Sequence, residues 1–151
     1  MKVMKKLMRV QIKKLNKNAK LPVYSSEGAA GADLYALLEN DFVIKPQETV
    51  LIPTGISMAI PSGYVGIIYA RSGLATKLGL VLANQAGIID SDYRGEIMVA
   101  IYNRSNVEQI ITNHQRIAQM VITSYIEANF EEIDELVSTS RGEGGFGSTG
   151  I

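Results

Sequence analysis

The sequence contains no cysteine and no tryptophan, and only one histidine, His114. Without cysteine, a disulfide framework, a zinc–thiolate site and a thiol nucleophile are all excluded. A serine–histidine–acid triad would have to use His114, which lies in a polar turn where we expect it to be solvated. The chemistry that remains is that of carboxylates with water as the nucleophile.

Long apolar runs are also missing, since none approaches the roughly eighteen residues of a membrane span. The first residues lead into no signal-type apolar stretch either. We therefore expect a soluble, cytoplasmic protein without a membrane partner. No Gly-x-x-x-x-Gly-Lys-Ser/Thr loop occurs, which excludes the common design of nucleoside triphosphatases.

The charges are unevenly distributed, although the fifteen basic and fifteen acidic residues balance. Eight of the basic residues, and no acidic residue, lie among the first twenty positions. Lys13 and Lys14 flank alternating apolar residues there, which is typical of the solvent side of a strand. The remainder of the chain is net negative and would repel a polyanion, so we expect no nucleic-acid partner.

Segments rich in valine, isoleucine and tyrosine dominate the chain, which predicts β-strands. The expected strands are Met8 to Leu15, Val50 to Ile60, Tyr64 to Tyr69, Glu96 to Tyr102, Val107 to Thr112 and Ile117 to Ile126. The short polar turns between them favour an antiparallel sandwich or barrel, so the fold class is mainly β. One short helix is predicted from Ser72, as its N-cap, to Leu78, before Gly79 ends it.

The segment Ile97 to Tyr102 is apolar on both alternating faces, so we expect both faces of this strand to be shielded from solvent. A second sheet could cover the outer face, but in so small a domain a partner subunit is an equally good cover. The pattern is a first indication of an oligomer.

The chain changes character near residue 138, after an acidic segment, 127–137, that is ambiguous between strand and coil. We therefore divide it into one domain, 1–137, and a flexible glycine-rich arm, 138–151. A disordered tail is the simpler interpretation. The arm nevertheless contains residues suited to holding a phosphate and a flat base, namely Arg141, Phe146, Ser148 and Thr149.

Two carboxylates stand out by their setting. Asp90 follows an apolar run and lies where a strand breaks into a turn, a partly desolvated position that suits a general base. An Asx-turn at Asp90 or Asp92 is an equally good interpretation. Asp33 lies among small residues that let a ligand approach, although a strand-end aspartate is the simpler alternative.

The run Arg71-Ser72-Gly73 is a third candidate site, directly after an apolar strand. At a strand-to-helix junction the positive charge, the hydroxyl and the free backbone N–H groups of these residues would point to the same side, which suits binding of a phosphate. Helix capping explains Ser72 equally well. It does not explain Arg71, whose charge is unfavourable near a helix N-terminus unless an anion is present.

With these residues in order, the chain resembles the trimeric dUTPase family, whose five motifs are matched across most of the sequence. They correspond to residues 30–36, 70–75, 84 with 87–95, 116–120 and 141–150. One such motif would be weak, but five in order are specific.

The resemblance implies a β jelly roll that assembles as a homotrimer, with active sites built from all three subunits and closed by the C-terminal arm. It also implies hydrolysis of dUTP to dUMP and pyrophosphate, which supplies dUMP for thymidylate synthesis and keeps uracil out of DNA. Asp90 would deprotonate the water that attacks the α-phosphorus.

By the same resemblance, a hairpin from Asn84 through Met98 would bind uracil, while Tyr93 would pack under the deoxyribose and exclude a ribose 2′-hydroxyl. The implied uracil and sugar contacts are Asn84, Gly87, Ile88, Ile89, Asp90, Tyr93, Met98 and Phe146. The implied phosphate contacts are Arg71, Ser72, Gly73, Gln119, Arg141, Ser148 and Thr149. The triphosphate would carry Mg²⁺, and Asp33 would touch the metal only through water.

Two alternatives share this scaffold. A dCTP deaminase would bind cytosine and need a different acid–base arrangement in place of the Asp90 segment. A catalytically silent nucleotide sensor would have no need of four residues that the chain retains together, namely Asp90, Arg71, Gln119 and Arg141. A turnover assay distinguishes all three.

Overall fold

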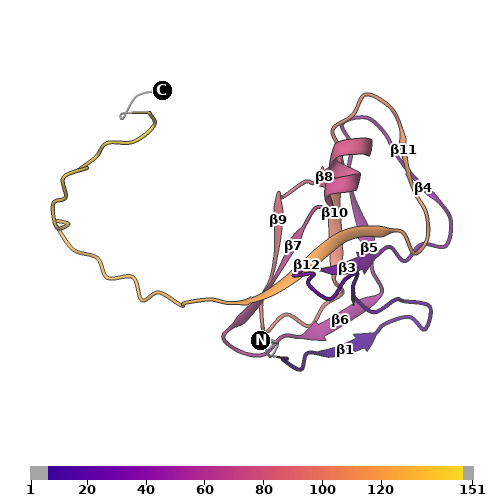
Figure 1. Cartoon of the computed structure of the whole chain (residues 1–151), viewed down its shortest axis with the longest axis horizontal. Coiled ribbons are helices and arrows are strands. Elements are labelled where there is room, and N and C mark those ends of the chain that lie inside the picture. Colours follow the sequence, from indigo (N-terminus) through magenta and orange to yellow (C-terminus); the bar gives the residue numbers. More distant parts are fainter. Residues whose placement is uncertain (1–6, 148–151) are drawn as a thin grey trace.

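The computed structural model describes residues 7–147, and strands account for most of their regular structure (Figure 1). The strands are β1 (Gln11–Lys14), β2 (Val23–Tyr24), β3 (Ala32–Tyr35), β4 (Phe42–Ile44), β5 (Thr49–Pro53), β6 (Ile56–Ala59), β7 (Tyr64–Tyr69), β8 (Leu80–Leu82), β9 (Ala86–Ile89), β10 (Met98–Asn103), β11 (Gln109–Ile111) and β12 (Arg116–Ser124). One short helical segment, η1 (Leu74–Leu78), lies between β7 and β8. The prediction of a mainly β chain is confirmed.

In the described part of the chain the strands form four antiparallel sheets. The largest has the order β2-β3-β12-β7-β9, and a three-stranded sheet has the order β5-β10-β8. Two smaller sheets pair β1 with β6 and β4 with β11. Within residues 7–147 none of these sheets closes on itself, so the predicted alternative of a barrel is wrong for the single chain.

One hydrophobic core joins the sheets, because every sheet contributes buried aliphatic side chains to the same cluster. Ile44, Ile52 and Ile111 are completely buried, from β4, β5 and β11 respectively. On β10, Val99 and Ile101 point into this core, whereas Met98 is 39% exposed. The second apolar face expected for this strand therefore exists and is only partly covered within one chain.

The predicted strand from Val50 to Ile60 is wrong, because the segment forms two strands with different partners. β5 pairs with β10, and β6 pairs with β1. The break is at Gly55, whose φ of 70° lies in the left-handed region that favours glycine. Both strands are rich in apolar residues, although only β6 is largely buried, so the apolar pattern of the sequence continues across the break and does not reveal it.

The predicted pairing of a hairpin from Asn84 through Met98 is also wrong. β9 pairs with β7, whereas β10 pairs with β5 and β8. The two arms belong to different sheets, and the loop 90–97 connects them. This loop is tied to the turn between β5 and β6, since the Ile97 N–H donates to the Ile56 carbonyl at 2.8 Å.

The predicted helix is confirmed at its C-terminal end and differs at its start. Gly79 ends it with a φ of 68°, and its N–H donates to the Leu74 carbonyl. The cap position is occupied by Gly73, and no side chain caps the helix, so Ser72 is not the N-cap. No helix within residues 7–147 has the length and apolar character needed to cross a membrane.

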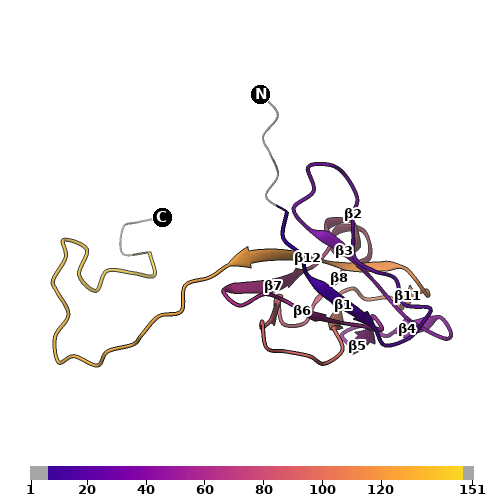
Figure 2. The same ribbon diagram turned by 90° about the horizontal axis from the view of Figure 1, so that it is seen from below.

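After β12 the chain continues without helix or strand and leads away from the sheets (Figures 1 and 2). The ambiguous segment 127–137 adopts no regular structure. Several large apolar side chains along this path are almost fully exposed, with 94% for Ile126 and Phe130 and 91% for Val137. A single chain therefore leaves several large apolar side chains of this acidic segment in water, which is unfavourable unless another surface receives them.

Candidate functional site

A cleft of about 320 Å³ lies beside β9 and carries most of the residues predicted to bind a base and sugar. Its lining consists of Leu51, Ile88, Ile89, Asp90, Tyr93, Glu96 and Met98. Five of these residues belong to the predicted set, whereas Leu51 and Glu96 do not. The predicted Asn84 and Gly87 do not line the cleft.

Asp90 lies at the end of β9, and its carboxylate makes no hydrogen bond or ion pair within residues 7–147. The turn that follows is held by the backbone, because the Tyr93 N–H donates to the Asp90 carbonyl oxygen at 3.2 Å. The alternative of a side-chain Asx-turn at Asp90 is therefore wrong. The side chain is exposed rather than partly desolvated, so a single chain leaves this carboxylate open to water.

The loop after Asp90 is braced by its own polar groups. The Tyr93 hydroxyl donates to the carbonyl of Glu96 at 3.0 Å. Arg94 folds back, and its Nη1 donates to the carbonyl of Ser91 at 2.6 Å. These contacts give Tyr93 a defined position at the wall of the cleft.

A second, more polar cleft of about 310 Å³ carries residues predicted to bind phosphate. Its lining consists of Ser25, Ala29, Ala30, Gly31, Asp33, Tyr69, Arg71, Ser72, Gln119 and Val121. Strand register explains the grouping, because Gln119 on β12 is directly opposite Asp33 on β3 and Tyr69 on β7. The predicted Gly73 lies next to this lining but does not form part of it.

A buried carboxylate holds two arginines at this cleft. Asp33 is 5% exposed, and its Oδ1 accepts from Arg71 Nε at 2.8 Å. Its Oδ2 accepts from Arg116 Nη1 at 3.3 Å. Asp33 therefore supplies the negative charge that makes Arg71 favourable near the helix N-terminus. Together, Asp33, Arg71 and Arg116 carry one net positive charge. Within residues 7–147 the terminal nitrogens of Arg71 make no hydrogen bond, which leaves them available to an anion.

Gln119 is fixed from two sides. Its Nε2 donates to the Ala70 carbonyl at 3.1 Å. Gly31 makes room for its other end, because a Cβ at residue 31 would lie 2.6 Å from Gln119 Oε1. The cleft thus combines a guanidinium, a hydroxyl and an amide in a fixed arrangement, which suits several phosphate oxygens.

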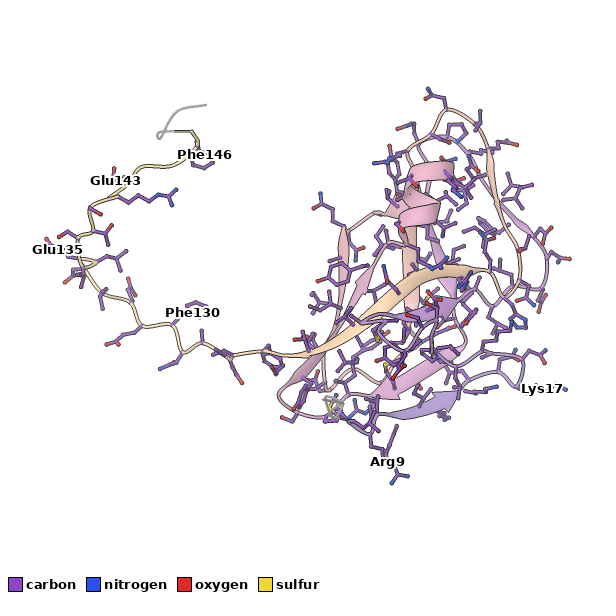
Figure 3. All side chains as sticks on the ribbon, viewed as in Figure 1. Arg9, Lys17, Phe130, Glu135, Glu143 and Phe146 are labelled. Atoms are coloured by element: carbon purple, nitrogen blue, oxygen red, sulfur yellow. The ribbon has the colours of Figure 1, made fainter. Side chains whose placement is uncertain are left out.

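The predicted residues of the arm are not brought to either cleft, since neither lining includes a residue after Val121. Figure 3 shows Phe146 near the far end of the extended segment, with its side chain fully exposed. Arg141 uses its Nε for a local contact to the Gly144 carbonyl at 2.8 Å. The predicted phosphate contacts Ser148 and Thr149 lie outside the described residues.

Arg116 and His114 had no predicted catalytic or binding role. Arg116 opens β12 inside the fourth motif, which was its only signal in the sequence. His114, expected in solvent, is half-buried, and its Nε2 lies 2.8 Å from the Asn18 carbonyl oxygen. Among the described residues no group of three or more histidine, aspartate or glutamate side chains could hold a metal ion.

The similarity to known proteins extends over nearly the whole chain. The family model described as dUTPase matches residues 17–150. A deoxyuridine 5′-triphosphate nucleotidohydrolase of Orientia tsutsugamushi (strain Ikeda) is 46% identical over 147 residues, which are 95% of this chain and 99% of that relative.

Solved structures of similar fold agree with the family model. A mutant dUTPase of Staphylococcus bacteriophage 80alpha with dUpNHpp is similar with a TM-score of 0.86 and 29% identity, covering 95% of this chain and 99% of that one. A mutant dUTPase from phage phi11 of S. aureus, described with a structural Mg(II) ion, gives 0.79 and 25% identity, covering 87% and 100%.

Proposed function

Because the chain belongs to the dUTPase family and hydrolyses dUTP to dUMP and pyrophosphate, we propose that the reaction takes place where the cleft beside β9 of one subunit meets the Arg71 cleft of another. The reaction supplies dUMP for thymidylate synthesis and keeps uracil out of DNA. The observation that carries the proposal is the cleft that places Asp90 beside the apolar walls of Ile88 and Met98.

Uracil binds in the cleft beside β9, between the apolar side chains of Ile88, Ile89 and Met98. The base then lies close to the backbone after β9, whose groups can pair with its edge. Tyr93 packs under the sugar and leaves no space for a 2′-hydroxyl. Asn84 and Gly87 act from the start of β9, where they set the strand that forms one wall.

Asp90 accepts a proton from the water that attacks the α-phosphorus. The new bond joins the water oxygen to this phosphorus, and the bond to the oxygen that bridges the α- and β-phosphates breaks, so pyrophosphate leaves in line. The carboxylate makes no hydrogen bond within the described residues and can therefore accept this proton. The related phage enzyme binds dUpNHpp, whose name places nitrogen at the α–β bridge, the position of the bond that is broken.

The triphosphate is held by the second cleft. The terminal nitrogens of Arg71, the Ser72 hydroxyl and the Gln119 amide contact its oxygens, and the Gly73 N–H adds a backbone donor. The arm supplies Arg141, Ser148 and Thr149 to the phosphates and Phe146 to the face of the uracil. Closing the arm also removes water from Asp90, which strengthens each electrostatic contact.

Magnesium fits this site as an ion brought by the substrate. Among residues 7–147, Asp33 is the only carboxylate that lines the phosphate cleft, and both of its oxygens already accept from arginines. Mg²⁺ retains water readily, so Asp33 would contact its water shell and the triphosphate would bind the ion directly. The metal would neutralise part of the triphosphate charge. A solved relative is described with a structural Mg(II) ion, which supports the identity of the metal but not this position for it.

A homotrimer is the assembly that brings these parts together. The two clefts share no residue, and the chain after β12 leads away from the sheets (Figure 1). Apolar side chains near the clefts are exposed in one chain, with 63% for Leu51, 59% for Ile88 and 41% for Tyr69. Light scattering should give a mass three times that of the 16.4 kDa chain. A fully active monomer would rule out the shared site.

Asp33→Asn tests whether this carboxylate acts mainly through Arg71. The amide keeps the shape and one acceptor but removes the charge between two arginines, so KM for dUTP should rise about tenfold. Excess Mg²⁺ should not restore it, because the position of Arg71 rather than the ion is affected. Steady-state kinetics at several Mg²⁺ concentrations measure this, with the exposed Asp41→Asn as the matched control. Full recovery with Mg²⁺ would assign Asp33 to the metal instead.

The substrate assignment is tested by pyrophosphate release from dUTP, dTTP, dCTP and UTP. Only dUTP should be hydrolysed at an appreciable rate, because in the proposed fit the cleft excludes a thymine methyl and Tyr93 excludes a ribose 2′-hydroxyl. Release of ammonia from dCTP would instead favour a deaminase. Tight binding of dUTP without turnover would favour a nucleotide sensor.

A further inference from the structure

The ring of Tyr93 lies directly against the backbone of Gly95. A Cβ built at residue 95 would lie 2.5 Å from Tyr93 Cζ and 2.9 Å from Cε2, and closer still to the hydroxyl oxygen. Real Cβ contacts are essentially never this short, so the ring and a side chain at residue 95 cannot occupy these positions together. The position of the tyrosine therefore depends on the absence of a side chain two residues later.

The backbone conformation of Gly95 does not explain why glycine stands there. Its φ is outside the left-handed region, unlike that of Gly55 or Gly79. An alanine could adopt the same backbone without strain. Contact with Tyr93 is thus the constraint that the structure shows at this position.

The backbone around Gly95 is tethered, so it cannot easily move away from the ring. Glu96 Oε1 accepts from the Gly55 N–H at 2.8 Å, and the Thr54 hydroxyl donates to the Ile97 carbonyl at 2.5 Å. Thr54 and Ile97 are 1% and 0% exposed. The Tyr93 ring, by contrast, is held by one hydrogen bond, and the residue is 44% exposed. A collision would therefore displace the ring rather than the loop.

From this geometry we infer that Gly95 is a specificity-determining position, which selects deoxyribose over ribose by fixing the ring of Tyr93. The inference rests on the proposed contact of Tyr93 with the sugar. Gly95 is a positioning residue and touches no substrate itself. Displacing the ring opens the space that would otherwise exclude a 2′-hydroxyl, so UTP gains entry while the base contacts of the cleft remain.

Gly95→Ala tests the inference through the ratio of kcat/KM for dUTP to kcat/KM for UTP. The ratio should fall about tenfold or more, mainly through faster UTP hydrolysis, because a steric wall is removed. The melting temperature should stay close to that of the wild type, since the ring can move into solvent. Gly28→Ala is the matched control, because a Cβ there meets nothing within 4 Å. An unchanged ratio, or an equal loss for both substrates, would overturn the inference.

A double-mutant cycle with Tyr93→Ala asks whether Gly95 acts through the ring. Once the ring is absent, adding Gly95→Ala should leave the dUTP/UTP ratio where Tyr93→Ala alone places it. A further fall of the same size would show an effect independent of Tyr93 and contradict the inference. The selectivity of the wild type distinguishes failure of the Tyr93 sugar contact from failure of the role given to Gly95. If it hydrolyses UTP as well as dUTP, the sugar contact of Tyr93 itself fails, whereas a selective wild type with an equally selective Gly95→Ala variant refutes only the role of Gly95.

Discussion

Asp90→Asn is expected to lower kcat for dUTP by about 10²–10⁴-fold, the range that general base catalysis contributes. The amide has the same shape as the carboxylate but cannot accept the proton of the attacking water. Because the Asp90 side chain makes no hydrogen bond within residues 7–147, its replacement should disturb no other contact. The turn is held by the backbone bond from Tyr93, which the variant retains.

The affinity for dUpNHpp shows whether the fall in kcat comes from the chemical step or from weaker substrate binding. Its dissociation constant should change little in Asp90→Asn, since the apolar walls and the phosphate cleft are intact. Asp92→Asn is the matched control, because this neighbouring carboxylate is exposed and does not line the cleft. Retained turnover in Asp90→Asn, or an equal loss in Asp92→Asn, would remove the general base assignment.

Deletion of residues 138–151 is expected to lower kcat/KM for dUTP by at least about 10²-fold, the effect of removing one or more donors to the reacting phosphate. The deleted arm would supply Arg141 and Phe146 to the closed site, and it would shield Asp90 from water. The stability of the protein should not change. All hydrogen bonds found for residues 138–147 are internal to this segment, and no residue in it is buried.

Thermal unfolding of the truncated protein provides the control for this deletion. A melting temperature equal to that of the full chain, together with lost activity, fits an arm that acts only on the closed site. A sharp fall in the melting temperature would mean that the arm packs against the folded body. Full activity without the arm would contradict its role in closure.

The fold class was predictable because long, strongly apolar strands carry the signal. β7 was predicted with its observed bounds, and β10 and β12 with small shifts at their ends. β3 was not named as a strand, since four residues that include alanine and aspartate give little pattern, whereas the apolar run before Asp90 did indicate β9. Which strands pair was not predictable either. The apolar pattern says that β9 is in a sheet but not that its neighbour is β7 rather than β10.

The candidate site was predictable to the extent that its residues are contiguous in sequence. The end of β9 and the loop that follows it are continuous in the chain, and they bring Ile88, Ile89, Asp90 and Tyr93 to one cleft. The ion pair of Asp33 with Arg71 joins residues 38 positions apart and depends on the register of three strands. Arg116 gave no separate signal, because only the fold reveals that it shares the same carboxylate.

Hydrolysis in ¹⁸O-labelled water tests the central claim most directly, since it identifies the phosphorus that the water attacks. If Asp90 directs water onto the α-phosphorus, one labelled oxygen appears in the phosphate of dUMP and the pyrophosphate carries none. Mass spectrometry of the two products after a single turnover distinguishes the outcomes. Label in the pyrophosphate would mean attack at the β-phosphorus and would contradict the proposed mechanism.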